Sequence, residues 1–458
     1  MTMISTAPPA PKFDRIRIAA DVRAIARFGG PILVNNLSIA AMSFVDTVMA
    51  GQLGARDLAG LAIGVSYFNL FLFIGLGLFM SLSPAVAHAY GADDKRAVKR
   101  YVQQSWWMLP VVTVLLFAGA WQARLVLTAI GIAPDVLPIA IAYVQIMSWG
   151  LPGLMGFFAL RFASEGLGHT RPIMYIAFAC VLLNIFGNWV FIYGKFGMPA
   201  MGAIGCAVAT ASCYWVMCLS MLLYVSRQRL YRPFELFRGM ERPNLQIVGE
   251  LLRLGAPMAG STLAEGGLFA VAALLMGVMG ATIASAHQIA LNYAGFMFMV
   301  PLAVSSATTI HVGHLRGAGS WVAARHAAST GIGMCVGVMA VSALVIVVMN
   351  DQIAALYTTD VAVRQLAASL LLLAAIFQVS DGLQIGAAGA LRGFKDTAVP
   401  MYLCLFSYWV VGFPVAYVLG VQRQLGPAYV WVGLIAGLSV SAMLLLTRYY
   451  FVSRRVEG

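Results

Sequence analysis

Long apolar runs constrain this 458-residue sequence more than any other feature. A chain that crosses lipid must satisfy its backbone hydrogen bonds within each segment, and a helix of ~20 apolar residues does so. Charged residues make up only 10% of the sequence, against about a quarter in soluble domains, so polar surface is scarce. We therefore predict an all-α membrane protein with twelve transmembrane helices, at 28–50, 58–86, 102–122, 138–163, 172–193, 202–225, 251–276, 283–311, 325–349, 365–390, 398–420 and 429–451.

The basic residues predict the orientation of these helices. Of the 29 Lys and Arg residues, all but five fall in the termini, in the even-numbered loops or at the adjoining span ends. The exceptions are Arg56, Arg124, Lys195, Arg364 and Arg423. Because cytoplasmic loops carry the excess of Lys and Arg, we expect both termini in the cytoplasm of a bacterial cell and the protein in its inner membrane. The net charge of +12 therefore reflects topology, and no nucleic-acid partner is expected.

Polar segments divide the chain. Residues 1–27 carry three prolines and five basic residues without a long apolar stretch, which predicts a cytoplasmic tail rather than a signal peptide. Residues 226–250, with five arginines, are predicted to link an N-lobe of six helices (28–225) to a C-lobe of six (251–451). A second tail follows at 452–458. All six cysteines lie inside apolar spans, so we expect neither disulfides nor a metal site among them.

The two predicted lobes resemble each other at a shift of 226 residues. The pairs that keep this shift include Pro31 and Pro257, Val86 and Val312, His88 and His314, and Gly91 and Gly317. Similar amino-acid composition alone would not keep all these matches at the same shift across the first two spans of each half. Two halves of the same orientation are parallel repeats, related by an axis along the membrane normal, with a cleft between them.

Three acidic residues lie inside apolar spans: Asp46, Glu265 and Asp381. An ionised carboxylate at membrane depth costs at least ~2.5–3.5 kcal/mol, so it normally faces the bundle interior. The basic residues of the spans, Arg392 among them, lie at the cytoplasmic ends, and none is expected to neutralise these acids. Each acid must then be protonated, bind a cation or face water, which describes a site for Na⁺, H⁺ or a cationic substrate. The alternative is a protonated structural acid hydrogen-bonded to a helix.

Amide side chains accompany these acids. Asn184 and Asn188 lie one turn apart in the fifth span, as do Gln288 and Asn292 in the eighth, and Gln378 shares a face with the acid of the tenth. Amide oxygens suit a hard cation such as Na⁺ and also a protonated carboxyl. Structural bonding between helices explains each amide pair equally well.

Motifs for other chemistry are missing from the sequence. It contains neither a Gly-Lys-Ser/Thr phosphate loop nor a His-Glu-x-x-His helix. We therefore expect no enzymatic activity and no cofactor, and an ion gradient as the energy source. A cleft lined by some of the 24 methionines and 25 phenylalanines would accept ligands of many shapes, because Met repacks easily.

Several separated motifs resemble the MATE (multidrug and toxic compound extrusion) family, and its NorM-type bacterial branch in particular. The first span carries Phe44-Val-Asp46-Thr-Val-Met-Ala-Gly51, the fifth Asn184-Ile-Phe-Gly-Asn188, the eighth Ala286-His-Gln288-Ile-Ala-Leu-Asn292, and the tenth a match from Asp381 to Asp396. The resemblance runs from about residue 28 to 450.

This resemblance implies a two-lobed antiporter that exports small organic cations, such as drugs and dyes, in exchange for Na⁺ or H⁺. In such proteins the acid of the first-helix motif, here Asp46, acts with the asparagines of the fifth helix, here Asn184 and Asn188, in an N-lobe cation site. The acids of the seventh and tenth helices, here Glu265 and Asp381, are implicated in a C-lobe site that can hold Na⁺. We expect the protein to act as a monomer.

The sequence also provides candidates for the substrate cleft, namely Gln288, Asn292, Phe377 and Gln378. Phe377 stands where similar members carry a Tyr. A hydroxyl ligand is therefore absent at this position, although a cation–π contact remains available. This departure leaves the choice between Na⁺ and H⁺ open.

Three other functions compete with this prediction. A flippase for lipid-linked oligosaccharides of a related fold should hold basic residues for the pyrophosphate, whereas three acids are found here. A membrane-embedded enzyme would need a paired catalytic set, yet the acids lie on three separate helices. A channel fits poorly with a pseudo-symmetric single chain and scattered acids.

Overall fold

The computed structural model describes residues 15–454, all of whose regular elements are helical. Twelve spans in this range are long and apolar enough to cross a membrane, which confirms the predicted all-α fold. Six of them form the first half: α1 (Arg15–Gly51), α2 (Ala55–Met80) continued by α3 (Leu82–Gly91), α4 (Lys95–Trp121), α6 (Leu137–Gly166), α7 (Arg171–Tyr193) and α8 (Ala203–Arg227). The short α5 (Ala123–Ile130) connects α4 to α6.

The second half repeats this plan. Its spans are α9 (Leu245–Val278), α10 (Ala281–Gly317), α11 (Trp321–Tyr357), α12 (Val361–Gly393), the composite 398–422 and α15 (Pro427–Arg454). The composite span consists of α13 (Ala398–Leu405), η2 (Phe406–Gly412), α14 (Phe413–Val415) and η3 (Ala416–Gln422), where η2 and η3 are π-helical.

Two helices begin earlier than predicted, inside the polar segments. Residues 15–27, predicted as part of a tail, are the first turns of α1, and Ile25 within them is fully buried. The expected linker is also shorter, because α9 begins at Leu245, where the Asn244 side chain accepts a hydrogen bond from the backbone of Gln246 at 2.9 Å. Such a cap satisfies a free backbone donor of the first turn and fixes the helix start. Residues 1–14 and 455–458 lie outside the described part of the chain.

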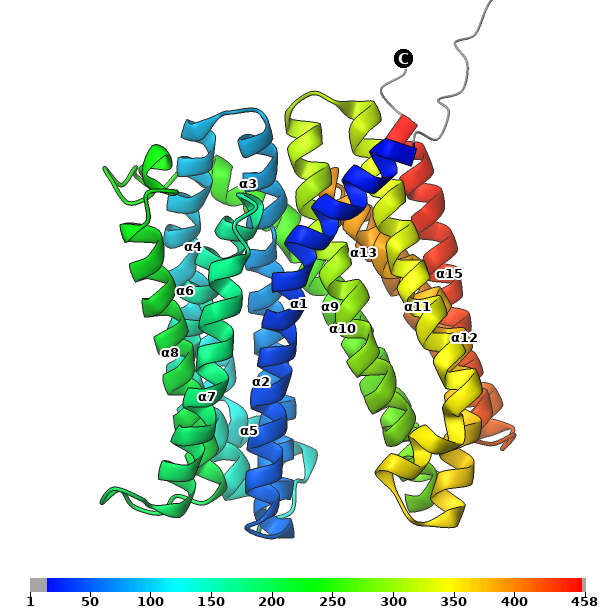
Figure 1. Cartoon of the computed structure of the whole chain (residues 1–458). Coiled ribbons are helices and arrows are strands. Elements are labelled where there is room, and N and C mark those ends of the chain that lie inside the picture. Colours follow the sequence, from blue (N-terminus) through cyan, green and yellow to red (C-terminus); the bar gives the residue numbers. More distant parts are fainter. Residues whose placement is uncertain (1–14, 455–458) are drawn as a thin grey trace, which may run out of the picture.

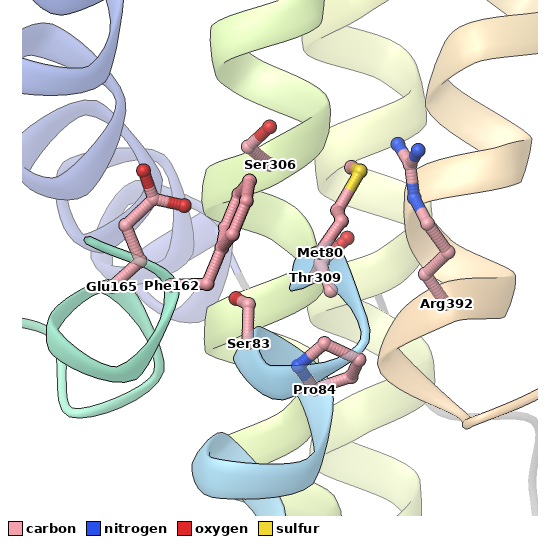
Figure 2. A pocket seen from close by; sticks show the side chains of 8 residues that line it. All are labelled: Met80, Ser83, Pro84, Phe162, Glu165, Ser306, Thr309 and Arg392. Carbon is pink, nitrogen blue, oxygen red and sulfur yellow. The ribbon is translucent and has the colours of Figure 1, made fainter. Parts of the chain in front are cut away.

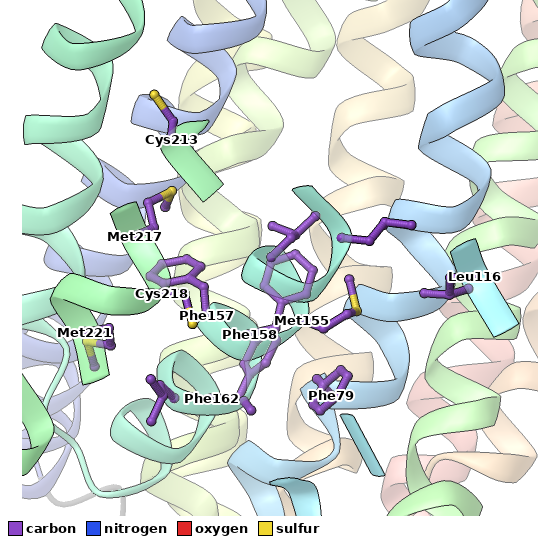
Figure 3. Packing of buried hydrophobic residues seen from close by; sticks show 14 of the residues in the cluster. Phe79, Leu116, Met155, Phe157, Phe158, Phe162, Cys213, Met217, Cys218 and Met221 are labelled. Carbon is purple, nitrogen blue, oxygen red and sulfur yellow. The ribbon is translucent and has the colours of Figure 1, made fainter. Parts of the chain in front are cut away.

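Each half has a hydrophobic core of its own. Figure 3 shows part of the N-lobe core, where Phe157 of α6 lies beside Cys218 of α8, and Met155 of α6 lies on the side of Phe79 and Leu116. The C-lobe core is built around Trp431 and Leu434 of α15, which are fully buried. Figure 1 shows the ribbons of the two lobes closest at the end where the C-terminus lies and further apart at the other. We call the former the terminal end.

Glycines allow the lobes to approach closely at the terminal end. A Cβ atom on Gly91 of α3 would lie 2.1 Å from the carbonyl oxygen of His314 on α10. A Cβ atom on Gly317 of α10 would lie 2.1 Å from the carbonyl oxygen of His88 on α3. The two contacts are reciprocal, and each residue has its counterpart 226 positions away. This is the geometry of a pseudo-twofold axis between parallel repeats.

The first helix of each half also crosses to the opposite lobe. Ile25 of α1 belongs to a cluster with Val304 and Ala307 of α10, and the Asp21 carboxylate pairs with His311 of α10 at 2.8 Å. Glu250 of α9 in turn accepts a hydrogen bond from the Tyr101 hydroxyl of α4 at 3.0 Å. The polar residues near the start of α1 are therefore partners in the junction between the lobes.

Candidate functional site

Asp46 lies at the centre of a hydrogen-bonded cluster inside the N-lobe. It comes from α1 and is only 4% exposed. Its Oδ1 accepts from the side-chain amides of Asn188 at 2.6 Å and Asn184 at 3.2 Å, both on α7. Its Oδ2 accepts from the hydroxyl of Thr210 on α8 at 2.8 Å. The structure thus brings together the predicted N-lobe residues and adds Thr210.

Bonds among the donors complete this cluster. The amide of Asn184 also donates to Thr210 Oγ1 at 3.0 Å, and the amide of Asn188 donates to Asn184 Oδ1 at 3.3 Å. Asn188 Oδ1 is buried and has no partner among residues 15–454. The donors orient the carboxylate, while the free amide oxygen beside it supplies a further ligand for a small cation.

The other two predicted acids lie in the C-lobe. Asp381 of α12 is 4% exposed, and its Oδ1 has no hydrogen-bond partner in the described chain. Glu265 of α9 is half-buried and lies within electrostatic range of Asp381. These carboxylates therefore lack the close cage of donors that surrounds Asp46.

Tyr408 is a residue of this site that the sequence analysis missed. Its side chain is 1% exposed, its hydroxyl accepts a hydrogen bond from the Gln384 amide, and it lies within electrostatic range of Glu265 and Asp381. Tyr408 belongs to the π-helical segment η2. π-Helical turns are rare and occur frequently at functional sites. A tyrosine in an apolar span gives no sequence signal for such a turn, which depends on packing against α15.

The Arg392 side chain reaches further into the bundle than its place in the sequence predicts. Its Cα lies one residue before the end of α12, yet its guanidinium reaches inward and donates to Ser305 Oγ on α10 at 2.8 Å. Ser305 in turn donates to the carbonyl of Ile385 at 2.6 Å, and its Oγ lies at the level of Gly389, whose added Cβ would be 2.3 Å away. The sequence predicted how deep the Cα of Arg392 lies, but not how far its long side chain reaches.

Figure 2 shows Arg392 at the edge of a small cavity where the two lobes meet. The cavity has a volume of about 10 Å³, roughly the space of one water molecule. Met80, Ser83, Pro84, Phe162 and Glu165 line it from the N-lobe, and Ser306, Thr309 and Arg392 from the C-lobe. Glu165 is already paired with Arg161 at 2.7 Å.

The four predicted cleft residues occupy two different environments. Gln288 and Asn292 of α10 are exposed, and Asn292 accepts a hydrogen bond from the Tyr357 hydroxyl at 3.1 Å. Phe377 and Gln378 are enclosed within the C-lobe, where Phe377 packs edge-on against Trp431 with ring centroids 5.8 Å apart. Both polar atoms of the Gln378 amide lack a partner in the described chain, so this side chain can still bind water or an ion.

A conventional metal centre is absent from residues 15–454, where no group of three or more His, Cys, Asp or Glu side chains could hold a metal ion. A Na⁺ site in this protein therefore has to use amide, hydroxyl or backbone oxygens together with the carboxylates. Hard cations accept such mixed oxygen ligands.

Comparison with known proteins agrees with the repeat. The MatE family model matches residues 31–190 and again residues 257–418, so the two matches begin 226 residues apart. The chain belongs to the MATE family. Within this family it is NorM-type, being 40% identical over 457 residues to the probable multidrug resistance protein NorM of Xanthomonas axonopodis pv. citri, with 99% of each chain covered. It is also 40% identical to the corresponding NorM protein of Xanthomonas campestris pv. campestris, over 96% of each chain.

Solved structures share the fold of this MATE protein at lower sequence identity. An outward-facing multidrug resistance MATE transporter of the MOP superfamily matches with a TM-score of 0.86 at 19% identity, covering 97% of this chain and 99% of that one. The eukaryotic MATE transporter AtDTX14 matches with a TM-score of 0.85 at 20% identity, covering 96% and 98%. These relatives are transporters rather than enzymes, and the chain is accordingly a multi-pass membrane protein of a transporter family.

Proposed function

We propose that this chain is a multidrug efflux antiporter that exports organic cations across a bacterial inner membrane in exchange for Na⁺ or H⁺. Two kinds of observation support the proposal. The NorM relatives that share 40% identity are named as probable multidrug resistance proteins. Each lobe of this chain also contains buried carboxyl groups beside amide and hydroxyl side chains, which is the chemistry that binds small cations.

The observation that carries the proposal is the buried carboxyl of Asp381, whose Oδ1 has no partner in the described chain, in the same lobe as Glu265. A single ionised carboxylate at membrane depth already costs about 2.5–3.5 kcal/mol, and a second one nearby adds repulsion. Binding of a Na⁺ or a proton removes most of that cost, and release restores it. The ion-free state then favours a cationic drug, so that ion and drug compete for the same charge, as antiport requires.

In this account Asp46, Asn184 and Asn188 form the coupling site of the N-lobe, with Thr210 as an additional donor. Glu265 and Asp381 form the coupling site of the C-lobe, with Tyr408 and Gln384 beside them. The lobes are packed together at the terminal end, which the basic loops assign to the cytoplasm. Ion and drug would therefore exchange from the opposite side in this conformation.

A flippase for lipid-linked oligosaccharides is the second candidate, because the fold alone does not decide the substrate. A MOP superfamily transporter from Pyrococcus furiosus, described as having a binding pocket of reverse polarity that suggests a different function, matches this chain with a TM-score of 0.82 at 19% identity. A pyrophosphate requires several basic side chains. The C-lobe holds one inward-reaching arginine, Arg392, against the two acids Glu265 and Asp381, which favours a cationic substrate.

Purified protein in liposomes tests the proposal. Under an imposed gradient of Na⁺, or separately of pH, ethidium should move against its own gradient and stop moving when the ion gradient is collapsed by an ionophore. Ethidium transport that ignores both gradients would contradict antiport. Cysteines placed at Arg96 and at Lys195, in a background without the native cysteines, should label from opposite sides of the membrane if the assigned orientation is correct.

A further inference from the structure

Two histidines of α10 bind helices of the first half at the terminal end, and the antiport scheme uses neither. His311 Nε2 lies 2.8 Å from Asp21 Oδ1 on α1, and His314 Nε2 lies 2.7 Å from the carbonyl oxygen of Gly166, the last residue of α6. An ionised carboxylate and a carbonyl only accept, so both histidines donate these hydrogen bonds. The two histidines are three residues apart and share one face of α10. Gly317, whose contact with α3 brings the lobes together, follows within one further turn.

The Asp21 carboxylate is enclosed by the junction between the lobes. Asp21 is 7% exposed, and its Oδ2 is buried without a partner in residues 15–454. The side chain of His311 is 16% exposed, so water screens the pair only in part. A neutral imidazole gives this carboxylate one hydrogen bond, whereas a protonated imidazole adds the attraction of an ion pair. The bond between the two residues is therefore stronger when His311 carries a proton.

Histidine is the side chain whose charge ordinarily changes between pH 5 and 8. His314 responds less than His311 does, because its acceptor is an uncharged carbonyl that it can bind in either protonation state. Within residues 15–454, His311 is the histidine that pairs with a carboxylate. We therefore expect the pH response of the junction to come from the pair of His311 and Asp21.

Other ionisable side chains of the described chain surround the two histidines. Glu165, next to Gly166, is paired with Arg161 at 2.7 Å. The arginines among the remaining groups keep their charge throughout the physiological range and give no response to pH. These groups come from every helix that packs around this part of α10: Arg17 of α1, His88 of α3, His169 between α6 and α7, Arg325 and His326 of α11, and Arg392 of α12.

The pair of Asp21 and His311 joins parts of the molecule that separate when the terminal end opens. Helix α1 is continuous from Arg15 to Gly51, and Asp46 on the same helix is bound inside the N-lobe. A C-lobe that moves away from the N-lobe at the terminal end therefore carries His311 away from Asp21. The same movement breaks the hydrogen bond between His314 and Gly166.

We propose that His311 and Asp21 form a pH-sensitive switch of the lobe junction, in which protonation of His311 holds the terminal end closed. The closed junction binds this proton more tightly than the open one, so a lower pH shifts the equilibrium toward the closed state. This inference rests on the proposed antiport function only for its consequence in transport. The consequence is that acid on the terminal side slows the uptake of drug from that side.

Labelling of one buried cysteine in purified protein tests the switch without any transport. Ser83 of α3 is 5% exposed and lines the cavity between the lobes, so Ser83→Cys in a background without the native cysteines reports opening of the junction. Its rate of reaction with a polar maleimide is measured at pH 6 and at pH 8. Each rate is divided by the rate of the same protein unfolded in denaturant, which removes the pH dependence of the thiol itself.

Four proteins with this cysteine are compared: the parent, His311→Gln, Asp21→Asn and His326→Gln. His311→Gln keeps a donor toward Asp21 but cannot take up the proton, and Asp21→Asn removes the charge that attracts it. His326→Gln is the matched control, because it removes a histidine of α11 that lies within electrostatic range of Asp21 without being bonded to it.

We expect the ratio of the normalised rates at pH 8 and pH 6 to be about fivefold or more higher in the parent and in His326→Gln than in the two variants of the pair. Comparison at equal pH removes the effect of protons that bind at other sites. A merely structural pair would raise the labelling of both variants by one factor at both pH values and leave the ratio unchanged.

Equal ratios in the parent and in the variants of the pair would overturn the proposal. If His311→Gln or Asp21→Asn does not fold, the other variant decides, because each removes one charge of the same pair.

Transport provides the second measurement. In everted membrane vesicles, whose bath faces the terminal end, gradient-driven uptake of ethidium should slow about fivefold more in the parent than in His311→Gln as the bath falls from pH 8 to pH 6. An equal slowing in both would contradict the consequence for transport. If the parent moves no ethidium under any ion gradient, the antiport function fails instead, and the labelling ratio of the purified proteins still decides the switch.

Discussion

Substituting alanine for either glycine of the lobe junction should loosen the terminal end. The Cβ of Gly317→Ala would lie 2.1 Å from the His88 carbonyl oxygen, and that of Gly91→Ala equally close to the His314 carbonyl oxygen. Ordinary contact begins at 3.4 Å, so α3 and α10 must separate by about 1.3 Å, the difference between these distances. Overpacking of this kind costs about 1–3 kcal/mol. Such a cost shifts the balance between closed and open junctions about 5- to 150-fold.

Labelling of a buried cysteine measures this shift. Ser83 of α3 is 5% exposed and lines the cavity between the lobes, and cysteine is nearly the same size as serine. In a background without the native cysteines, Ser83→Cys should react with a polar maleimide much faster in Gly317→Ala than in the parent. Gly337→Ala on α11 is the control, because nothing lies within 4 Å of its added Cβ. Unchanged labelling and unchanged thermal stability in both junction variants would show that these glycines do not hold the two lobes together.

Three further predictions concern single side chains. Thr210→Val removes one hydrogen-bond donor from the Asp46 carboxylate and should weaken the apparent affinity for the coupling ion roughly 10- to 150-fold, because a hydrogen bond to a charged group contributes about 1.5–3 kcal/mol. Ser212→Ala, which removes a hydroxyl bound only to the backbone of its own helix, should leave this affinity unchanged. Titration of ethidium efflux with the ion checks both variants. Burial, aided by the charge of Arg27, lowers the pKa of His169 from 6.5, so thermal stability should fall as pH drops below about 6.5, and His169→Gln should reduce that fall. Pro31→Ala restores a backbone donor within α1, and efflux with unchanged rate and ion dependence would show that this proline is only tolerated.

The sequence was sufficient for the architecture because its signals are local. The lengths of the apolar runs predicted the twelve spans. The constant shift of 226 residues agrees with the reciprocal contacts of Gly91 and Gly317. The start of α1 was missed because its charged residues resemble a tail. Those charges are accommodated by pairing across the lobes, as between Asp21 and His311, and no local pattern reveals such a partner.

Only some residues of the candidate sites could be predicted from the sequence. Asp46 and Asp381 stood out because an acid in an apolar span is rare. Thr210 did not, since a hydroxyl within a helix usually bonds to its own backbone and carries no signal. Tyr408 and Arg392 depend on a widened helical turn and on the reach of a long side chain. Depth along a helix can be read from sequence, but rotation about its axis and packing partners cannot.

The most direct test of the coupling site is the effect of Asp381→Asn and Glu265→Gln on gradient-driven ethidium efflux in liposomes. Each substitution keeps size and hydrogen bonding while removing a charge, and a neutral amide is easier to bury than a carboxylate, so folding should be preserved. Asp46→Asn should act similarly in the N-lobe. Both C-lobe variants should express and fold as the wild type does but no longer couple efflux to a Na⁺ or pH gradient. Wild-type efflux rates with unchanged ion dependence in both variants would contradict this expectation.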